Sequence, residues 1–341
     1  MDSISIDLWE SWWHPVCHRS EVANARDFVR LEACGEELVV FNDGSDVVVF
    51  DNLCPHRGAR IFDGHSGNAR FLCRYHGWSY AGGKIFTGAR DDIVVTPGAL
   101  CLRTYASAWV GDFLFASKRP KRDLADQLGD LWPVLERVSR SCAARADINA
   151  YTFEADWRIA IENALEPYHV GVIHGDSLDT LDLQPGTNRY SGANSVWETT
   201  LGNDRMARQL NRLAPMFDLQ WQYQGYWSVF LFPFSMISST WGYSYSQQNF
   251  FPSAEPEKSS FLSRLYSARL KPAVKPEVLA GFFASTSEMN RRVFEEDHAI
   301  CKRVPFRAWS SEVPAIFLPS EEKIVRFREA YRDAVQAGAA S

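Results

Sequence analysis

The chain of 341 residues has no surplus of basic residues, no long apolar run and no cationic, apolar leader at its N-terminus. It has 36 Lys and Arg against 42 Asp and Glu, a formal net charge of -6. We therefore expect no nucleic-acid partner, because phosphates would find no basic excess to neutralise them. No segment approaches the roughly 20 apolar residues of a membrane span, and the first residues do not resemble a secretory signal. The sequence predicts a soluble, cytoplasmic protein with no membrane partner.

The chain also lacks the cysteine pattern of a disulfide framework. Its cysteines number seven, an odd count, and they are scattered over a long chain. In a reducing compartment, closely spaced Cys and His residues indicate metal binding instead. The sequence has neither a Gly-x-Gly-x-x-Gly nucleotide fingerprint nor a second cysteine cluster of the ferredoxin type.

Changes in residue pattern predict three segments. Residues 8–117 are β-rich, and two apolar, β-branched runs separated by Asn-Asp-Gly-Ser predict a hairpin around residues 42–45. Residues 118–150 are charged and predict a helical connection. Residues 151–341 predict a mixed domain with helices near 157–170, 275–304 and 320–337, and with strands through about 265.

Four residues of the first segment form a metal-ligand constellation. Cys54 and His56 make a Cys-x-His arm, and Cys73 and His76 follow sixteen residues later as a Cys-x-x-His arm. Two such arms on neighbouring loops can give one iron two thiolates and the other iron two imidazoles, which is the ligation of a Rieske [2Fe–2S] centre. A glycine follows each arm, where the backbone must bend around a cluster. A structural zinc site built from the same four residues is the alternative.

A second set of donors lies in the segment ADWRIAIENALEPYHVGVIH. On one continuous helix Glu162, Glu166 and His169 would share a face, and Pro167 offers a break that lets His174 turn back towards them. Two histidines with one further carboxylate form the facial triad of non-haem Fe(II) oxygenases.

Asp297 is the candidate for the third ligand, since it falls within an apolar stripe of the helix expected near 275–304. A buried carboxylate is costly unless it is paired or ligated. A salt bridge to Arg158 or Arg303 is the alternative, while Glu295 and Glu296 fall off the stripe and are expected to face solvent.

These motifs resemble those of one family. Cys-Pro-His-Arg-Gly followed by Cys-x-Tyr-His-Gly-Trp resembles the Rieske domain of aromatic-ring and alkyl-group oxygenases, with arginine where the family usually has proline between the second cysteine and the tyrosine. DWRIAIENALEPYHVGVIH and FEEDHAIC resemble the segments that hold the family's catalytic iron. The resemblance implies an α+β fold, in which a β-rich Rieske domain precedes a helix-grip (START-like) catalytic domain with an antiparallel sheet and helices.

The resemblance also implies roles for individual residues. His169, His174 and Asp297 would hold a mononuclear Fe(II), and Glu166 would link the Rieske histidine of one subunit to an iron-ligating histidine of the next. The glutamate spacing is similar to that of the subgroup acting on quaternary ammonium compounds such as carnitine and glycine betaine, although Pro167 stands where that subgroup often has cysteine.

The activity implied by the resemblance is that of a terminal oxygenase. A separate flavin/iron–sulfur reductase or a ferredoxin would supply electrons from NAD(P)H, O2 would be the co-substrate, and subunits would form a homotrimer. Hydroxylation or oxidative dealkylation of a small organic substrate, with a quaternary amine among the candidates, is favoured over cis-dihydroxylation of an aromatic ring. A Rieske electron carrier without oxygen chemistry, and a protein with zinc at both sites, are the alternatives from other classes.

One aromatic group bears on the substrate. Trp241, Tyr243 and Tyr245 alternate along an expected strand. They would either line a pocket, where they stack on an aromatic substrate or cage a cationic ammonium group, or belong to the core of the sheet. The core is the preferred interpretation, because strands favour aromatic residues.

Overall fold

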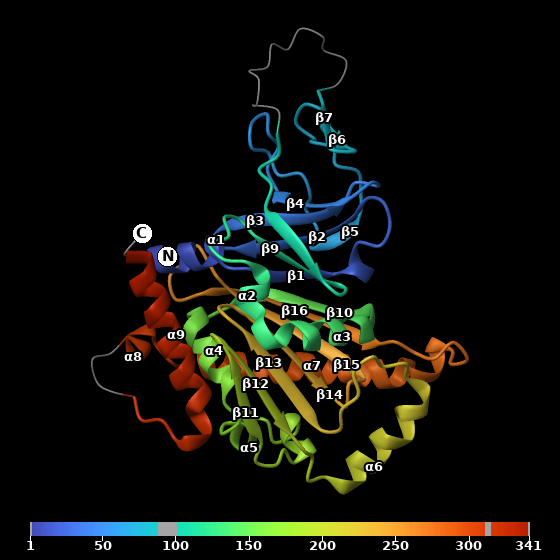
Figure 1. Cartoon of the computed structure of the whole chain (residues 1–341), viewed down its shortest axis with the longest axis vertical. Coiled ribbons are helices and arrows are strands. Elements are labelled where there is room, and N and C mark those ends of the chain that lie inside the picture. The colour runs from blue at the N-terminus through green and yellow to red at the C-terminus, as the bar shows by residue number, and fades with distance from the viewer. Residues whose placement is uncertain (1, 88–100, 311–314, 340–341) are drawn as a thin grey trace.

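The computed structural model describes residues 2–87, 101–310 and 315–339, and its α+β architecture confirms the expected fold class. A smaller β-rich part and a larger part with one broad sheet follow each other along the long axis of the molecule (Figure 1). The two ends of the chain lie near each other, beside the junction of these parts. Within the described ranges, no helix combines the length and the hydropathy of a membrane span.

The smaller part contains three antiparallel sheets, with strand orders β4-β3-β2-β5, β1-β9-β8 and β6-β7. The predicted hairpin is present, because β3 pairs with β4 and places Asn42 opposite Val47. The elements are α1 Ser3–Ser11, β1 His14–His18, η1 Arg19–Glu21, β2 Asp27–Ala33, β3 Glu36–Asn42, β4 Val47–Asp51, β5 Ser66–Asn68, β6 Ser79–Ala81, β7 Lys84–Phe86, β8 Ala106–Val110 and β9 Phe113–Ser117.

The connection between the two parts is shorter than the sequence predicts. It consists of α2 Leu124–Leu128, η2 Gly129–Leu131 and α3 Trp132–Ser141. The chain then enters the long strand β10, Cys142–Phe153, which crosses the predicted boundary at residue 150. This strand escaped the sequence analysis because it is an edge strand whose side chains are mostly half-exposed, so that it lacks the apolar run of a buried strand.

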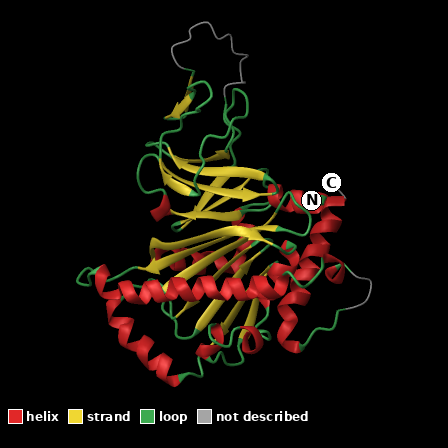
Figure 2. Cartoon of the chain, turned by 180° about the vertical axis from the view of Figure 1, so that it is seen from behind, coloured by secondary structure: helices red, strands yellow, loops and turns green. Residues whose placement is uncertain are grey.

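The larger part is a seven-stranded antiparallel sheet in the order β10-β16-β15-β14-β13-β12-β11, and the long helix α7 lies across one face of it (Figure 2). The helices expected near 275–304 and 320–337 are present as α7 and α9. The elements after β10 are α4 Trp157–Leu165, α5 Val170–Ile173, η3 Leu178–Leu181, β11 Thr187–Ser191, β12 Asn194–Thr199, α6 Asp204–Leu213, η4 Ala214–Met216, β13 Tyr226–Leu231, β14 Ser235–Thr240, β15 Ser244–Pro252, β16 Ser259–Ala268, η5 Pro276–Leu279, α7 Ala280–Cys301, α8 Phe306–Trp309, η6 Pro319–Glu321 and α9 Glu322–Ala339.

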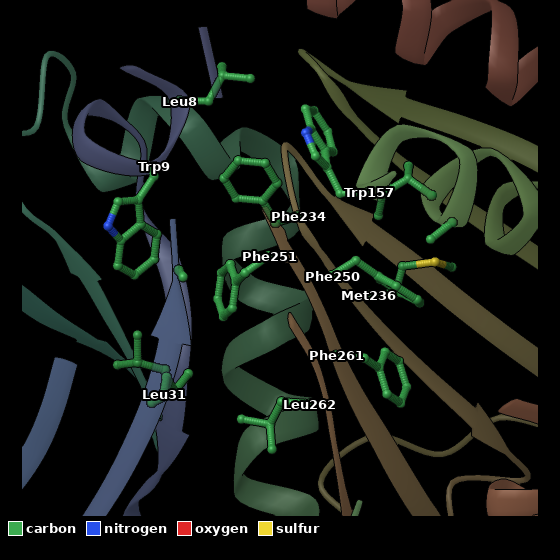
Figure 3. Packing of buried hydrophobic residues seen from close by; sticks show 14 of the residues in the cluster. Leu8, Trp9, Leu31, Trp157, Phe234, Met236, Phe250, Phe251, Phe261 and Leu262 are labelled. Atoms are coloured by element: carbon green, nitrogen blue, oxygen red, sulfur yellow. The ribbon is translucent and has the colours of Figure 1, made fainter. Parts of the chain in front are cut away.

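One hydrophobic core joins the two parts. Trp9 and Leu31 of the smaller part belong to the same buried cluster as Phe234, Phe251 and other side chains of the larger sheet (Figure 3). The ring of Trp9 packs edge-on against Phe251, with 5.2 Å between the centroids. Because apolar burial of this kind is the main stabilising term in folding, the two parts are held in a fixed arrangement.

Candidate metal centres

Two loops of the smaller part share one backbone design. In the first loop the Cys54 amide donates to the carbonyl of Ala59, and the amide of Gly58 donates back to the carbonyl of Cys54. The second loop repeats both hydrogen bonds at the same spacing, from Cys73 to Trp78 and from Gly77 to Cys73. Both glycines have a positive φ, +69° and +74°, which residues with a Cβ rarely adopt. The glycine after each arm is therefore required by the turn.

The donors of these loops are separated by type. The thiols of Cys54 and Cys73 are buried, whereas the rings of His56 and His76 are exposed and lie 4.6 Å apart between centroids. Burial raises the pKa of Cys54, and the adjacent thiol of Cys73 raises it further. Trp78 stacks on His56 at 4.6 Å with an angle of 8° between the rings. Two thiols inside and two imidazoles outside fit the mixed ligation of a Rieske [2Fe–2S] cluster.

A single-ion zinc site fits these residues less well. Such a site needs all four donor atoms around one ion at about 2.0 to 2.3 Å, which keeps the donors within about 5 Å of one another. Among the described residues, the only group of three or more His, Cys, Asp or Glu donors within 4.8 Å of one another is His169, His174 and Asp297.

The second site is built around a break in the chain rather than along one helix. Helix α4 ends at Leu165, and Glu166 is already extended, with φ -114° and ψ 143°. Pro167 explains this, because a proline disfavours helical backbone in the residue before it. The predicted continuous helix over 157–170 is therefore wrong. His169 and His174 instead flank the single turn α5.

These two histidines meet Asp297 of α7. One oxygen of Asp297, Oδ1, lies 3.1 Å from Nε2 of His174 and 3.5 Å from Nε2 of His169. The same oxygen accepts a hydrogen bond from the Asn163 side chain at 2.8 Å. Two imidazoles and a carboxylate converge on one point, as in the facial triad of non-haem Fe(II) enzymes.

Carboxylates behind the histidines fix the direction in which each ring points. Nδ1 of His169 lies 2.5 Å from Glu166, and Nδ1 of His174 lies 2.7 Å from Glu296. A proton on each Nδ1 leaves the Nε2 lone pairs directed at the shared point, which is the usual arrangement for metal-binding histidines. Burial lowers the pKa of His174, but the carboxylates of Asp297 and Glu296, which accept hydrogen bonds from the charged ring and attract its charge, outweigh this effect, and the pKa lies above its ordinary value.

Two expectations about neighbouring residues were wrong, and one alternative is not observed. Glu162 does not share the site, because it pairs with Arg328 and accepts a hydrogen bond from Trp309. Glu296 is not directed at solvent, since it orients His174. Arg158, which was an alternative partner of Asp297, forms its ion pairs with Asp156 and Asp2 instead.

A cavity beside the donors divides into two chambers. The inner chamber, about 70 Å³, is lined by the predicted iron ligands, Glu166 and a lysine of α9, Lys323. The outer chamber, about 300 Å³, lies between the sheet and α7, and strand β15 contributes Ser244, Ser246 and Gln248 to its wall. The chambers adjoin, because five residues line both: Leu178, Tyr226, Gln248, Val293 and Phe294.

The aromatic residues expected in the core of the sheet are found there. Trp241, Tyr243 and Tyr245 are buried in one hydrophobic cluster and line neither chamber. Only Tyr245 lies on a strand, because Trp241 and Tyr243 form the turn before β15. Tyr226 of strand β13 lines both chambers, and its place in the site was not predicted from the sequence.

Comparison with known families covers both halves of the chain. A model of the Rieske [2Fe-2S] domain matches residues 12–101, and a model of the ring hydroxylating alpha subunit (catalytic domain) matches residues 138–337. The large subunit of anthranilate 1,2-dioxygenase from Acinetobacter baylyi is 30% identical over 203 residues, which cover 54% of this chain and 42% of that protein. The carnitine monooxygenase oxygenase subunit of Escherichia coli K12 is 31% identical over 211 residues, covering 56% and 50%.

Among solved structures, the quaternary ammonium Rieske monooxygenase CntA superposes with a TM-score of 0.74 at 19% identity, covering 96% of this chain and 88% of that one. At this identity the likeness establishes the fold. The matched part of the chain spans about half the length of these curated relatives.

Proposed function

Because the chain belongs to the Rieske-type ring-hydroxylating oxygenase alpha subunits, we propose that it is a terminal oxygenase that hydroxylates or oxidatively dealkylates a small organic substrate. In such a component a bound [2Fe–2S] cluster would supply single electrons, and a bound mononuclear Fe(II) would supply the chemistry that activates O2. The observation that carries the proposal is the convergence of His169, His174 and Asp297 in a chain that also holds separate thiol and imidazole pairs. A Rieske electron carrier would have no use for this second donor group.

We assign the ligands residue by residue. Cys54 and Cys73 would bind one iron of the cluster, and His56 and His76 the other. His169, His174 and Asp297 would bind the Fe(II) through two Nε2 atoms and a carboxylate oxygen. The support is that each donor set matches its metal in number, type and grouping.

Glu166 is proposed to connect the two centres across a subunit contact. In one chain they are far apart: β6 and β7, which follow the cluster loops, lie at one end of the molecule, and α5 lies towards the other (Figure 1). Large hydrophobic side chains are exposed at both places, with Tyr75 beside the cluster and Tyr168 and Val172 beside the iron ligands. If the surface beside the cluster in one subunit contacts the surface beside the iron ligands in the next, the subunits are joined head to tail and can close a ring under cyclic symmetry. A homotrimer in which Glu166 bridges to the neighbour's Rieske histidine accounts for both features.

We propose that the electrons come from another protein, and the lack of a dinucleotide fingerprint in this sequence supports this. We propose a flavin/iron–sulfur reductase or a ferredoxin, supplied by NAD(P)H. Cis-dihydroxylation of an aromatic ring is the second candidate reaction, because the relatives include anthranilate 1,2-dioxygenase and 2-halobenzoate 1,2-dioxygenase as well as carnitine monooxygenase.

The test begins with protein purified without oxygen. We expect about three irons and two acid-labile sulfides per chain, with a Rieske-type EPR signal after reduction. His169→Ala should reduce the iron to about two per chain and leave the EPR signal unchanged. Two irons in the unaltered protein, or zinc in a colourless preparation, would contradict the proposal.

The role of Glu166 needs a separate measurement. In single-turnover experiments Glu166→Gln should slow oxidation of the reduced cluster by O2 and substrate, while iron and sulfide contents stay the same. The exposed Glu295→Gln is the matched control and should behave like the unaltered protein. Equal rates in both variants would remove Glu166 from the electron path.

A further inference from the structure

Lys323 is a buried cation on the wall of the inner chamber. It lies in the first turn of α9, and 4% of it is exposed. The ring of Trp197 is 5.3 Å from its Nζ, and the carboxylate of Glu166 acts on it through space. Within the described parts of the chain, no residue accepts a hydrogen bond from Nζ or forms an ion pair with it. A buried ammonium group without such partners is destabilising.

The carboxylates of the inner chamber already have partners. Both oxygens of Glu166 are occupied by His169, one by Nδ1 and the other by the backbone amide. Asp297 is held by the two histidines and Asn163. Burial lowers the pKa of Lys323 to about 7, against the attraction of Glu166, which raises it. Within the described residues, the ammonium group is therefore attracted by Glu166 through space but has no direct ion-pair or hydrogen-bond partner.

The outer chamber contains no Asp, Glu, Lys, Arg or His in its described lining. Hydroxyl groups in its wall also donate hydrogen bonds to backbone carbonyls of the chain itself. The Ser239 hydroxyl donates to the carbonyl of Ser244 at 2.6 Å, and the Thr286 hydroxyl donates to that of Phe282 at 2.8 Å. This chamber therefore suits the uncharged body of a ligand. Among the described residues that line the two chambers, Lys323 is the one charged side chain without a direct partner.

We propose that Lys323 binds an anionic group of the substrate, a carboxylate, while the uncharged remainder of the molecule extends into the outer chamber. This inference rests on the proposed function and specifies the substrate class of that same site. A carboxylate supplies the hydrogen-bond acceptors that Nζ lacks, and such charge-assisted bonds are about twice as strong as neutral ones. A quaternary amine without an acidic group would instead bring a second positive charge to a site whose ammonium group already lacks a direct partner.

The test compares matched ligands by isothermal titration calorimetry on the purified holoprotein at pH 6.5. The probes are benzoate, phenylacetate and hexanoate, each with its uncharged amide, and benzyltrimethylammonium. We expect at least one carboxylate to bind about tenfold or more tightly than its amide, as a charge-assisted contact predicts. Lys323→Met should abolish that preference and change amide binding by less than about threefold. Lys271→Met, at an exposed lysine outside both chambers, should keep it.

The proposal is overturned by any of three results. These are carboxylates that bind no better than their amides, a preference that survives in Lys323→Met, or tighter binding of benzyltrimethylammonium than of benzoate. Lys323 would then serve only as a counter-charge to Glu166. Iron, sulfide and EPR measurements on the same preparation decide the proposed function independently, since the calorimetric preference needs no turnover. If the mononuclear iron is missing but carboxylates still bind more tightly than their amides, the oxygenase function is refuted. If the metal content is complete but carboxylates bind no more tightly, the role of Lys323 is refuted.

Discussion

Lys323→Met should make the protein more stable even though it removes part of the proposed substrate site. Burial lowers the pKa of this lysine from 10.5 to about 7. At roughly 1.4 kcal/mol for each pKa unit, burying the charged form of the lysine costs about 5 kcal/mol more than burying the neutral form. At pH 7 half of the folded lysines are neutral, so the loss of folding stability is about 4 kcal/mol. Methionine fills a similar volume without a charge. We expect the free energy of unfolding to rise by about 2 to 4 kcal/mol at pH 7, where the lower figure allows for relaxation around the lysine.

The pH dependence of this gain has a defined sign. Between pH 7 and 10.5 the unfolded chain binds a proton on Lys323 that the folded chain largely lacks, so the stability of the unaltered protein rises with pH over this window. The advantage of the methionine variant should be full below about pH 7 and shrink by roughly 1.4 kcal/mol per pH unit above it. Glu166 and Trp197 are the groups that face the ammonium from other elements, and neither changes in the variant.

Urea unfolding of both proteins at pH 6, 7, 8 and 9 measures this difference, with Lys271→Met as the exposed control that should leave stability unchanged within about 0.5 kcal/mol. A methionine variant that is less stable than the unaltered protein at pH 7 would show that Lys323 has a stabilising partner in the folded chain. A gain that does not depend on pH would refute the electrostatic explanation.

Three shorter predictions concern the metal centres and the subunit contact. Glu296→Gln weakens the hydrogen bond that orients its histidine, so iron affinity in a chelator competition should fall about 10- to 100-fold, whereas the exposed Glu295→Gln should show no loss. Gly77→Ala forces a Cβ into a conformation with φ +74°, at about 1 to 2 kcal/mol, and should lower labile sulfide per chain; normal cluster content would refute the need for glycine. Val172→Asp places a charge at a side chain that is 83% exposed and predicted to contact a neighbouring subunit. It should reduce the oligomer to smaller species in light scattering, and Val278→Asp, at another exposed valine, should not.

The cluster loops could be predicted from sequence because they are local. The hydrogen bonds that shape each loop join residues four or five apart, such as Cys54 with Gly58 and Ala59. The loop conformation is therefore determined by residues within the short motif. The fold class followed from the family resemblance, and the two C-terminal helices followed from the residue pattern. Strand β10 did not, because its exposure as an edge strand removes the apolar pattern that identifies strands.

The sequence predicted which donors the second site brings together, but not the residues that support them. The three donors converge as the sequence suggested, yet the helix face that was expected to carry Glu162 and Glu166 does not exist, because the helix ends before Pro167. Glu296 was placed in solvent from its position on α7 alone. Its actual role depends on how α5 brings His174 against that side of the helix, a tertiary contact that no periodicity reveals.

Lys323 could have been found by the argument that found Asp297. Asp297 is a charge on the apolar stripe of one helix, and Lys323 shares the buried face of α9 with Phe327 and Tyr331, at intervals of four residues. A charged residue on a buried stripe must acquire a partner or be destabilising. The chain supplies the partners of Asp297, two histidines and Asn163. It supplies none for Lys323 among the described residues, which is why the missing partner is best sought in the molecule that enters the chamber.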